Sequence, residues 1–229
     1  MERLIGLKST EYEHPADKAA LEKLRNSTVF KTLMTEFIHQ GVERIYRIQY
    51  TGSSLKIKKQ DYPEIYKALE NAGAALGMQE LPALYLQYYY AINAFTTGKK
   101  EPLVVVYSGT IDLLEEDELQ YIIGHELGHI LSDHVLYHVM VQGLVDFINL
   151  PAKGLIELPL YYWSRMSELT ADRAGLLACQ DLNTAIRAMI KMAGLPQSQY
   201  DKINVQAFID QARDFNEKNT GFLDETFKF

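Results

Sequence analysis

Leu119–His134 reads LQYIIGHELGHILSDH and carries the pentapeptide HELGH, from His125 to His129. On a helix, residues four apart lie on one face, so both imidazoles of the pentapeptide can reach a single ion. Glu126 then projects beside them, where its carboxylate can act on a water molecule at that ion. This H-E-x-x-H spacing predicts a zinc site of the peptidase type, provided that another part of the chain supplies a third protein ligand.

The composition is ordinary for a soluble globular protein. The 229 residues are 47% hydrophobic and 23% charged, which is enough to bury a sizeable core. The formal net charge is −7 and no basic stripe is present, so we expect no nucleic-acid partner. No repeat or linker-like stretch divides the chain, so we expect one domain over residues 1–229 and a monomer.

Cys179 is the one cysteine, so an internal disulfide is impossible. Its setting, AGLLACQDL, is typical of a buried structural thiol on a helix, and a single thiol fits a reducing compartment. The first 18 residues lack the continuous apolar segment of a secretory signal, and no stretch is long enough for a transmembrane helix. We therefore expect a cytoplasmic location.

Hydrophobic periodicity and turn residues predict an α+β fold that is mainly helical. The expected helices span residues 16–40 (in two pieces), 64–76, 116–134, 165–179, 181–193 and 205–218. A β-hairpin is expected over 42–59, because VERIYRIQY and LKIKK alternate on either side of TGSS. Strands are expected at Leu84–Tyr90 and at Leu103–Tyr107, which is nearly all apolar and so central in a sheet, with Ile92–Gly98 as a connection. The domain then divides into N-terminal helices and a hairpin (1–80), a catalytic core (81–182) and C-terminal helices (183–229).

A third ligand has several candidates near the pentapeptide. If one helix continues through them, His134 and His138 point away from the face of His125, so both are interpreted as surface or lightly packed residues. Asp133 lies roughly on the right side but one turn too far, so a local hydrogen bond or solvent exposure is favoured for it.

Glu168 and Asp172 lie further along, in the segment Ser167–Arg173 (SELTADR), four residues apart on one helical face. Like charges so placed are unfavourable unless a cation faces them. On their own they are interpreted as a solvated acidic face paired with arginines. Together with HELGH they predict that Glu168 completes the ligand set and that Asp172 orients an imidazole by accepting its second N–H.

HELGH followed by SELTADR resembles metallopeptidase family 48, which includes the HtpX-like bacterial proteases and the CAAX prenyl proteases. The resemblance covers residues 81–182 and implies a zincin-like (gluzincin) metallopeptidase, with a small sheet beside the H-E-x-x-H helix and a second, glutamate-bearing helix. It implies one Zn²⁺ per chain, held by His125, His129 and Glu168, with Glu126 as general base and Asp172 behind a ligand.

The resemblance extends to an Asn-Ala-Phe segment, here Asn93, Ala94 and Phe95, which implies the upper edge of a substrate cleft. An extended polypeptide substrate would lie antiparallel to an edge strand near Asn93–Thr97. Asn93 is interpreted equally well as a turn residue at a strand end. Many family members have membrane-spanning segments, some of them between HExxH and the third ligand. In that interval this chain has only the apolar stretch Val135–Trp163, broken by charges and prolines.

Val135–Trp163 has two interpretations. Core packing around prolines is favoured, and the alternative is an amphipathic lid that makes peripheral contact with a membrane. For the whole chain, the function expected is that of a zinc-dependent metalloendopeptidase. The alternatives are a catalytically silent or latent zinc-stabilised interaction domain and a metal-free helical scaffold.

Overall fold

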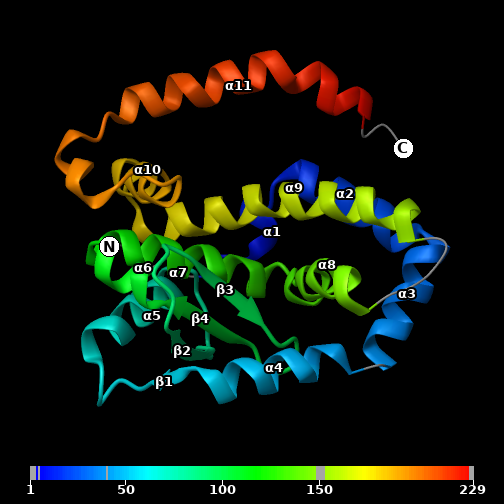
Figure 1. The fold of residues 1–229 in the computed structure, drawn as a ribbon, viewed down its shortest axis with the longest axis horizontal. Coiled ribbons are helices and arrows are strands. Elements are labelled where there is room, and N and C mark those ends of the chain that lie inside the picture. The colour runs from blue at the N-terminus through cyan, green and yellow to red at the C-terminus, as the bar shows by residue number, and fades with distance from the viewer. Residues whose placement is uncertain (1–3, 5, 40, 148–152, 227–229) are drawn as a thin grey trace.

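The computed structural model describes residues 4, 6–39, 41–147 and 153–226. It is mainly helical, with one small mixed sheet (Figure 1). The helices are α1 (Ser9–Tyr12), α2 (Pro15–Asn26), α3 (Thr28–His39), α4 (Val42–Ser53), α5 (Pro63–Ala75), α6 (Ser108–Leu113), α7 (Glu116–Leu131), α8 (Val135–Phe147), α9 (Lys153–Cys179), α10 (Leu182–Met192), a 3-10 turn at Gln197–Lys202 and α11 (Val205–Thr226). The strands are β1 (Leu55–Ile57), β2 (Ala83–Gln87), β3 (Ala94–Thr97) and β4 (Leu103–Tyr107).

The sheet has the order β1-β2-β4-β3. β4 is parallel to β2 and antiparallel to β3, with Phe95 opposite Val105. β4 is therefore an inner strand, and its residues Leu103–Val106 are fully buried, as the apolar run LVVVY predicts. β3 is an edge strand that lies beside α7, so one side of its backbone is not paired within the sheet.

Helix α7 carries the HELGH segment and packs along α9, which carries Glu168. A capping box between Glu115 and Glu118 begins α7, and acidic residues occupy its first turn. A Cβ atom added to Gly128 would lie 2.5 Å from the Cβ of Ala174, and one added to Gly124 would lie 2.2 Å from that of Ala178. Glycines on α7 facing alanines on α9 therefore let the two backbones approach closely.

Two hydrophobic clusters surround this helix pair. The first joins α5, α7, the sheet and the C-terminal half of α9. The second joins α2, α3, α8 and the part of α9 around Trp163, which is fully buried. Ile130 packs against both clusters, so the end of α7 lies where they meet.

The predicted β-hairpin over 42–59 is wrong. Its first half is helix α4, and only Leu55–Ile57 is a strand. The inward-pointing residues of this helix recur at a spacing of four: Val42, Tyr46 and Tyr50. This spacing is helical, but it also fits the alternation of apolar and polar residues in a strand. The prediction of Ile92–Gly98 as a connection is wrong as well, because β3 occupies most of it.

The helix that begins at Glu116 ends at Leu131 rather than continuing to His134. Asp133 has a φ of 58°, in the left-handed region, and reverses the chain before α8 begins. Helix α9 is longer than the predicted 165–179 helix. It begins at Lys153 and has Pro159 inside it. The described part of Val135–Trp163 favours core packing, since Val135, Met140 and Trp163 are among its buried side chains; residues 148–152 lie outside the described part.

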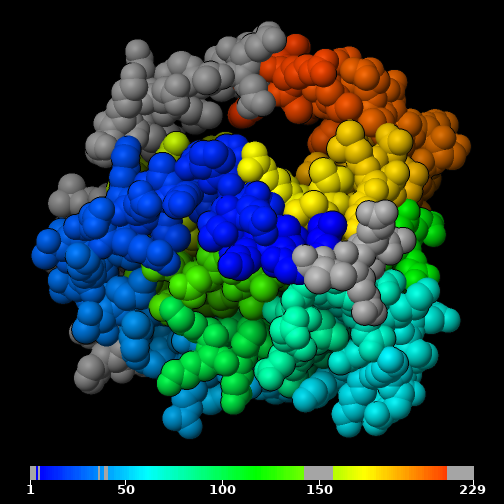
Figure 2. Space-filling model, turned by 180° about the vertical axis from the view of Figure 1, so that it is seen from behind, coloured from blue at the N-terminus to red at the C-terminus, as the bar shows by residue number. Residues whose placement is uncertain are grey.

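The C-terminal helices α10 and α11 follow the predicted segments 181–193 and 205–218 closely. Buried Lys191 on α10 contacts buried Glu118 on α7 at 2.6 Å, which fastens α10 to the core. Between Val205 and Phe215 no described side chain of α11 is buried, and Figure 2 shows this orange part of the helix at the outer edge of the molecule. Among the described helices, none combines the length and apolar character that crossing a membrane requires.

Candidate active site

The pentapeptide residues predicted to bind the metal and activate water line one cavity of 560 Å³. Its lining includes His125, Glu126 and His129 from α7, and Glu168 and Asp172 from α9. Asn93, Ala94 and Phe95, predicted to contact substrate, line the same cavity from the edge strand. The structure thus brings together every side chain that the sequence singled out for the site.

His125 lies between two carboxylates of α9. Its Nδ1 is 3.0 Å from Asp172 Oδ1 and its Nε2 is 3.1 Å from Glu168 Oε2. Burial disfavours charge on this imidazole, but the hydrogen bonds to Asp172 and Glu168 outweigh it and raise the pKa of His125 to about 10. Tyr121, one turn earlier on α7, donates its hydroxyl to the same Asp172 oxygen at 3.0 Å.

His129 turns its Nε2 toward the same point. That atom is 3.2 Å from His125 Nε2 and 3.6 Å from Glu168 Oε1. Burial lowers the pKa of His129 well below the usual value for an imidazole, so the side chain is neutral and keeps a lone pair. Two imidazole nitrogens and a carboxylate therefore converge, with all three ligand atoms within 4.8 Å of one another. This is a donor set that suits a metal cation.

Glu126 is buried beside this group and is held by the edge strand. Thr96 on β3 donates its hydroxyl to Glu126 Oε2 at 2.8 Å. Burial raises the pKa of Glu126, so this carboxylate binds a proton more readily than one in water. Thr96 was not predicted from the sequence, because nothing in the strand pattern separates it from its neighbours.

Asn93 behaves as a strand-end residue in this structure. Its side-chain oxygen accepts a hydrogen bond from the backbone N–H of Ala94 at 2.9 Å. Its backbone N–H donates to Thr110 Oγ1 at 2.8 Å. These contacts match the turn interpretation of Asn93 and leave substrate contact as a prediction.

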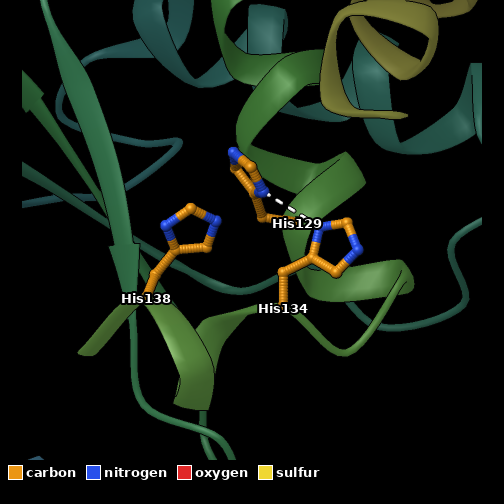
Figure 3. A group of neighbouring side chains, drawn as sticks. All are labelled: His129, His134 and His138. Carbon is orange, nitrogen blue, oxygen red and sulfur yellow. Dashed lines mark hydrogen bonds between the residues drawn. The ribbon is translucent and has the colours of Figure 1, made fainter. Parts of the chain in front are cut away.

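The interpretation of His134 as a surface or lightly packed residue is wrong, whereas the His138 side chain is 20% exposed and lines the cavity. The reversal at Asp133 turns both back toward the site, and His134 is only 1% exposed. His134 Nδ1 is 3.1 Å from His129 Nδ1, and the His138 ring lies 4.6 Å from the His129 ring. Figure 3 shows the three imidazoles side by side, with a dashed line for the hydrogen bond between His129 and His134. Asp133 itself is half exposed and pairs with Arg25 and Lys99, as its solvent-facing interpretation predicted.

Comparison with known proteins agrees with this geometry. The model of peptidase family M48 matches residues 59–223, which is most of the chain. The chain belongs to peptidase family M48. The M48 match includes α7, α9 and the edge strand, so it covers all the elements that line the cavity on the side of the histidines.

Named M48 relatives align with this chain at about the same level of identity. The plastoglobule-localized metallopeptidase 48 of Arabidopsis thaliana is 32% identical over 95% of this chain and 65% of its own length. A protease HtpX homolog of Tropheryma whipplei strain TW08/27 is 32% identical over 59% of this chain and 47% of its own, and one of Halobacterium salinarum is 30% identical over 43% and 34%. The chain thus spans less than two thirds of the length of these curated relatives. No solved structure matches it significantly.

Proposed function

We propose that this chain is a zinc-dependent metalloendopeptidase of the gluzincin type, with one Zn²⁺ held by His125, His129 and Glu168. The observation that carries the proposal is the convergence of two imidazole Nε2 atoms 3.2 Å apart, with the Glu168 carboxylate beside both. Asp172 accepts the Nδ1 proton of His125, so Nε2 is the atom that faces that point and would give up its proton to a bound metal. The metallopeptidase name of the Arabidopsis relative supports the same metal-dependent activity.

Glu126 is proposed as the general base. A zinc ion at this site would polarise the scissile carbonyl and acidify a water molecule. Glu126 is placed to accept the proton of that water, since it borders the ligands but points to Thr96 rather than to Glu168. Its raised pKa helps it hold the proton and then deliver it to the leaving amine nitrogen.

The substrate is proposed to be an extended polypeptide that pairs with β3. Ala94, Phe95 and Thr96 line the cavity, and within the described part of the chain β3 pairs only with β4. Backbone pairing along this edge would place a peptide bond near Glu126 without strong demands on sequence. The opposite wall is apolar, formed by Met189, Met192 and Phe208 among others.

A cytoplasmic location with peripheral membrane contact also stays a proposal. Leu158 and Tyr161, near the start of α9, are exposed and could reach a lipid surface. One relative is named as plastoglobule-localized and chloroplastic, which concerns that protein. Flotation of this chain with lipid vesicles would test the contact.

The function is tested by Glu126→Gln. This variant should bind zinc as the wild type does and lose at least about 100-fold in kcat/KM on an unfolded protein such as casein, because only the proton acceptor is removed. Zinc content is measured by elemental analysis and cleavage by gel electrophoresis. Wild-type protein treated with a chelator serves as the control, and added zinc should restore its activity.

The same experiment separates the alternatives. Zinc binding without cleavage of any unfolded substrate by the wild type would favour a silent or latent interaction domain. Wild-type protein that contains no zinc and loses no stability in chelator would favour the metal-free scaffold.

A further inference from the structure

Asp17, in the first turn of α2, is a buried carboxylate that is distant along the chain from the sequence motifs of the site. It is 2% exposed and accepts three hydrogen bonds. Trp163 Nε1–H donates to its Oδ1 at 2.9 Å, and Thr170 Oγ1–H donates to its Oδ2 at 2.6 Å. His134 Nε2 lies 3.0 Å from the same Oδ2. An ionised carboxylate only accepts hydrogen bonds, so His134 must carry its proton on Nε2.

The proton position on His134 determines the proton position on His129. An imidazole that carries one proton, on Nε2, holds a lone pair on Nδ1 and can only accept there. The nearest group is His129 Nδ1 at 3.1 Å, which therefore donates; Figure 3 marks this hydrogen bond with a dashed line. His129 then has its lone pair on Nε2, the atom that faces His125 and Glu168.

We propose that His134 and Asp17 are positioning residues that hold His129 as its Nδ1–H tautomer and aim its Nε2 lone pair at the metal site. They do for His129 what Asp172 does for His125, from a different part of the chain. The inference rests on the proposed function, since it concerns the same ligands. It also gives the N-terminal helix α2 a part in the site.

A metal ion among His129, His134 and His138 is the competing interpretation, because ligand atoms of these three also lie within 4.8 Å. His138 does not support it. Ser167 donates its hydroxyl to Ser164 O, so it accepts the Nε2 proton of His138 at 2.9 Å. An ion there would also take the Nδ1 lone pair of His129, and a neutral imidazole would then carry its proton on Nε2 and could not join His125 and Glu168.

Asp17→Asn tests the proposal with almost no change in shape. Trp163 Nε1–H keeps the amide oxygen turned to itself, so the amide NH₂ faces His134 Nε2. His134 must then carry its proton on Nδ1 and donate it to His129 Nδ1. His129 would accept there and carry its own proton on Nε2, the atom that needs a lone pair for the metal. We expect zinc affinity to fall about 10- to 100-fold, measured by competition with a chromophoric chelator. The visible spectrum of the cobalt-substituted protein should change as well.

Trp163→Phe supplies the matched control. Without the indole N–H, the new side-chain amide of the double variant Asp17→Asn/Trp163→Phe can turn its oxygen to His134 and restore the original proton order. The double variant should therefore bind zinc more tightly than Asp17→Asn alone, although it has lost one more packed side chain. A merely structural role for Asp17 predicts the opposite order. Thermal unfolding in chelator reports how much each variant is destabilised.

A measurement on the wild type keeps the inference testable if the variants fold poorly. Long-range ¹H–¹⁵N spectra of the zinc-loaded protein should show His129 protonated on Nδ1 and His134 on Nε2. A proton on Nδ1 of His134, or unchanged zinc affinity in Asp17→Asn, would overturn the inference alone. A wild type that binds no zinc would overturn the proposed function instead.

Discussion

His138 stands beside the proposed ligands without joining them. It lines the cavity, yet its Nε2 proton is donated to Ser167, so neither ring nitrogen offers a lone pair toward His125 and Glu168. Burial lowers the pKa of His138 to about 4. This imidazole is therefore neutral in the folded protein at pH 7.

The buried His138 should make stability depend on acid pH. Its unfolded pKa is about 6.5, so as pH falls the unfolded chain binds the proton first and the folded state loses stability between about pH 6.5 and about pH 4. The loss is roughly 3 kcal/mol at most. Urea unfolding in chelator at pH 7 and pH 4.5 should show a smaller difference for His138→Gln than for the wild type. An equal difference in both proteins would contradict the assignment.

Among the elements, the pair α7 and α9 determines the geometry of the site. Gly124 and Gly128 face Ala178 and Ala174, and Gly175 packs against Tyr121. Because Gly128 lies between the two histidines in sequence, any increase in the separation of the helices at this point moves Glu168 away from His125. The small residues at the contact between α7 and α9 thus determine the geometry of the site as well as the packing of the core.

Gly128→Ala should both destabilise the protein and weaken metal binding at the proposed site. The added methyl would lie 2.5 Å from the Cβ of Ala174 and 3.2 Å from the Cα of Ala171, so the helices must separate. We expect a loss of about 1–3 kcal/mol in urea unfolding, with weaker zinc binding. Gly52→Ala is the control, since a Cβ there meets nothing within 4 Å and removes flexibility from α4. Gly52→Ala should leave stability unchanged or raise it slightly. A similar loss of stability in both variants would contradict the inference that α7 and α9 need a glycine at their point of closest contact.

At the scale of the whole molecule, the site lies where the two hydrophobic clusters meet. Asp17 comes from the N-terminal helices, Thr96 from the sheet, and the proposed ligands from α7 and α9. A metal held by both helices joins segments that are separate in the unfolded chain. Zinc binding at the proposed site would therefore be coupled to the stability of the entire fold.

Zinc should raise the thermal stability of the wild type. At a free concentration 100 times its Kd, a ligand that binds only the folded state adds about 2.7 kcal/mol. Calorimetry with excess zinc and with chelator should show a clear difference in Tm. Glu168→Gln removes the anionic ligand, so its Tm should respond much less to zinc. An equal response in both proteins would place the bound zinc elsewhere.

Local pattern was enough for the two helices that carry the motifs. The spacing of His125 and His129, and of Glu168 and Asp172, puts each pair on one helical face whatever the rest of the chain does, because helix periodicity is a property of the backbone. The apolar run Leu103–Tyr107 likewise predicted an inner strand, which β4 confirms. Val42–Ser53 was misassigned because its apolar residues fit both a strand and a helix. In the folded protein it is a helix, with Val42 buried in the second hydrophobic cluster and Tyr50 against Phe95 of β3.

Tertiary structure decided the surroundings of those motifs. One left-handed residue, Asp133, ends α7 and turns His134 into the core, where helical extrapolation had placed it on the surface. Asp17 and Thr96 reach the site from distant segments, and no periodicity in either segment indicates it. The sequence by itself determined which side chains share a helix face, since that depends on bonds within a few residues. Only the packed fold decided which hydrogen-bond partners stand behind them, because those contacts form between segments up to 153 residues apart.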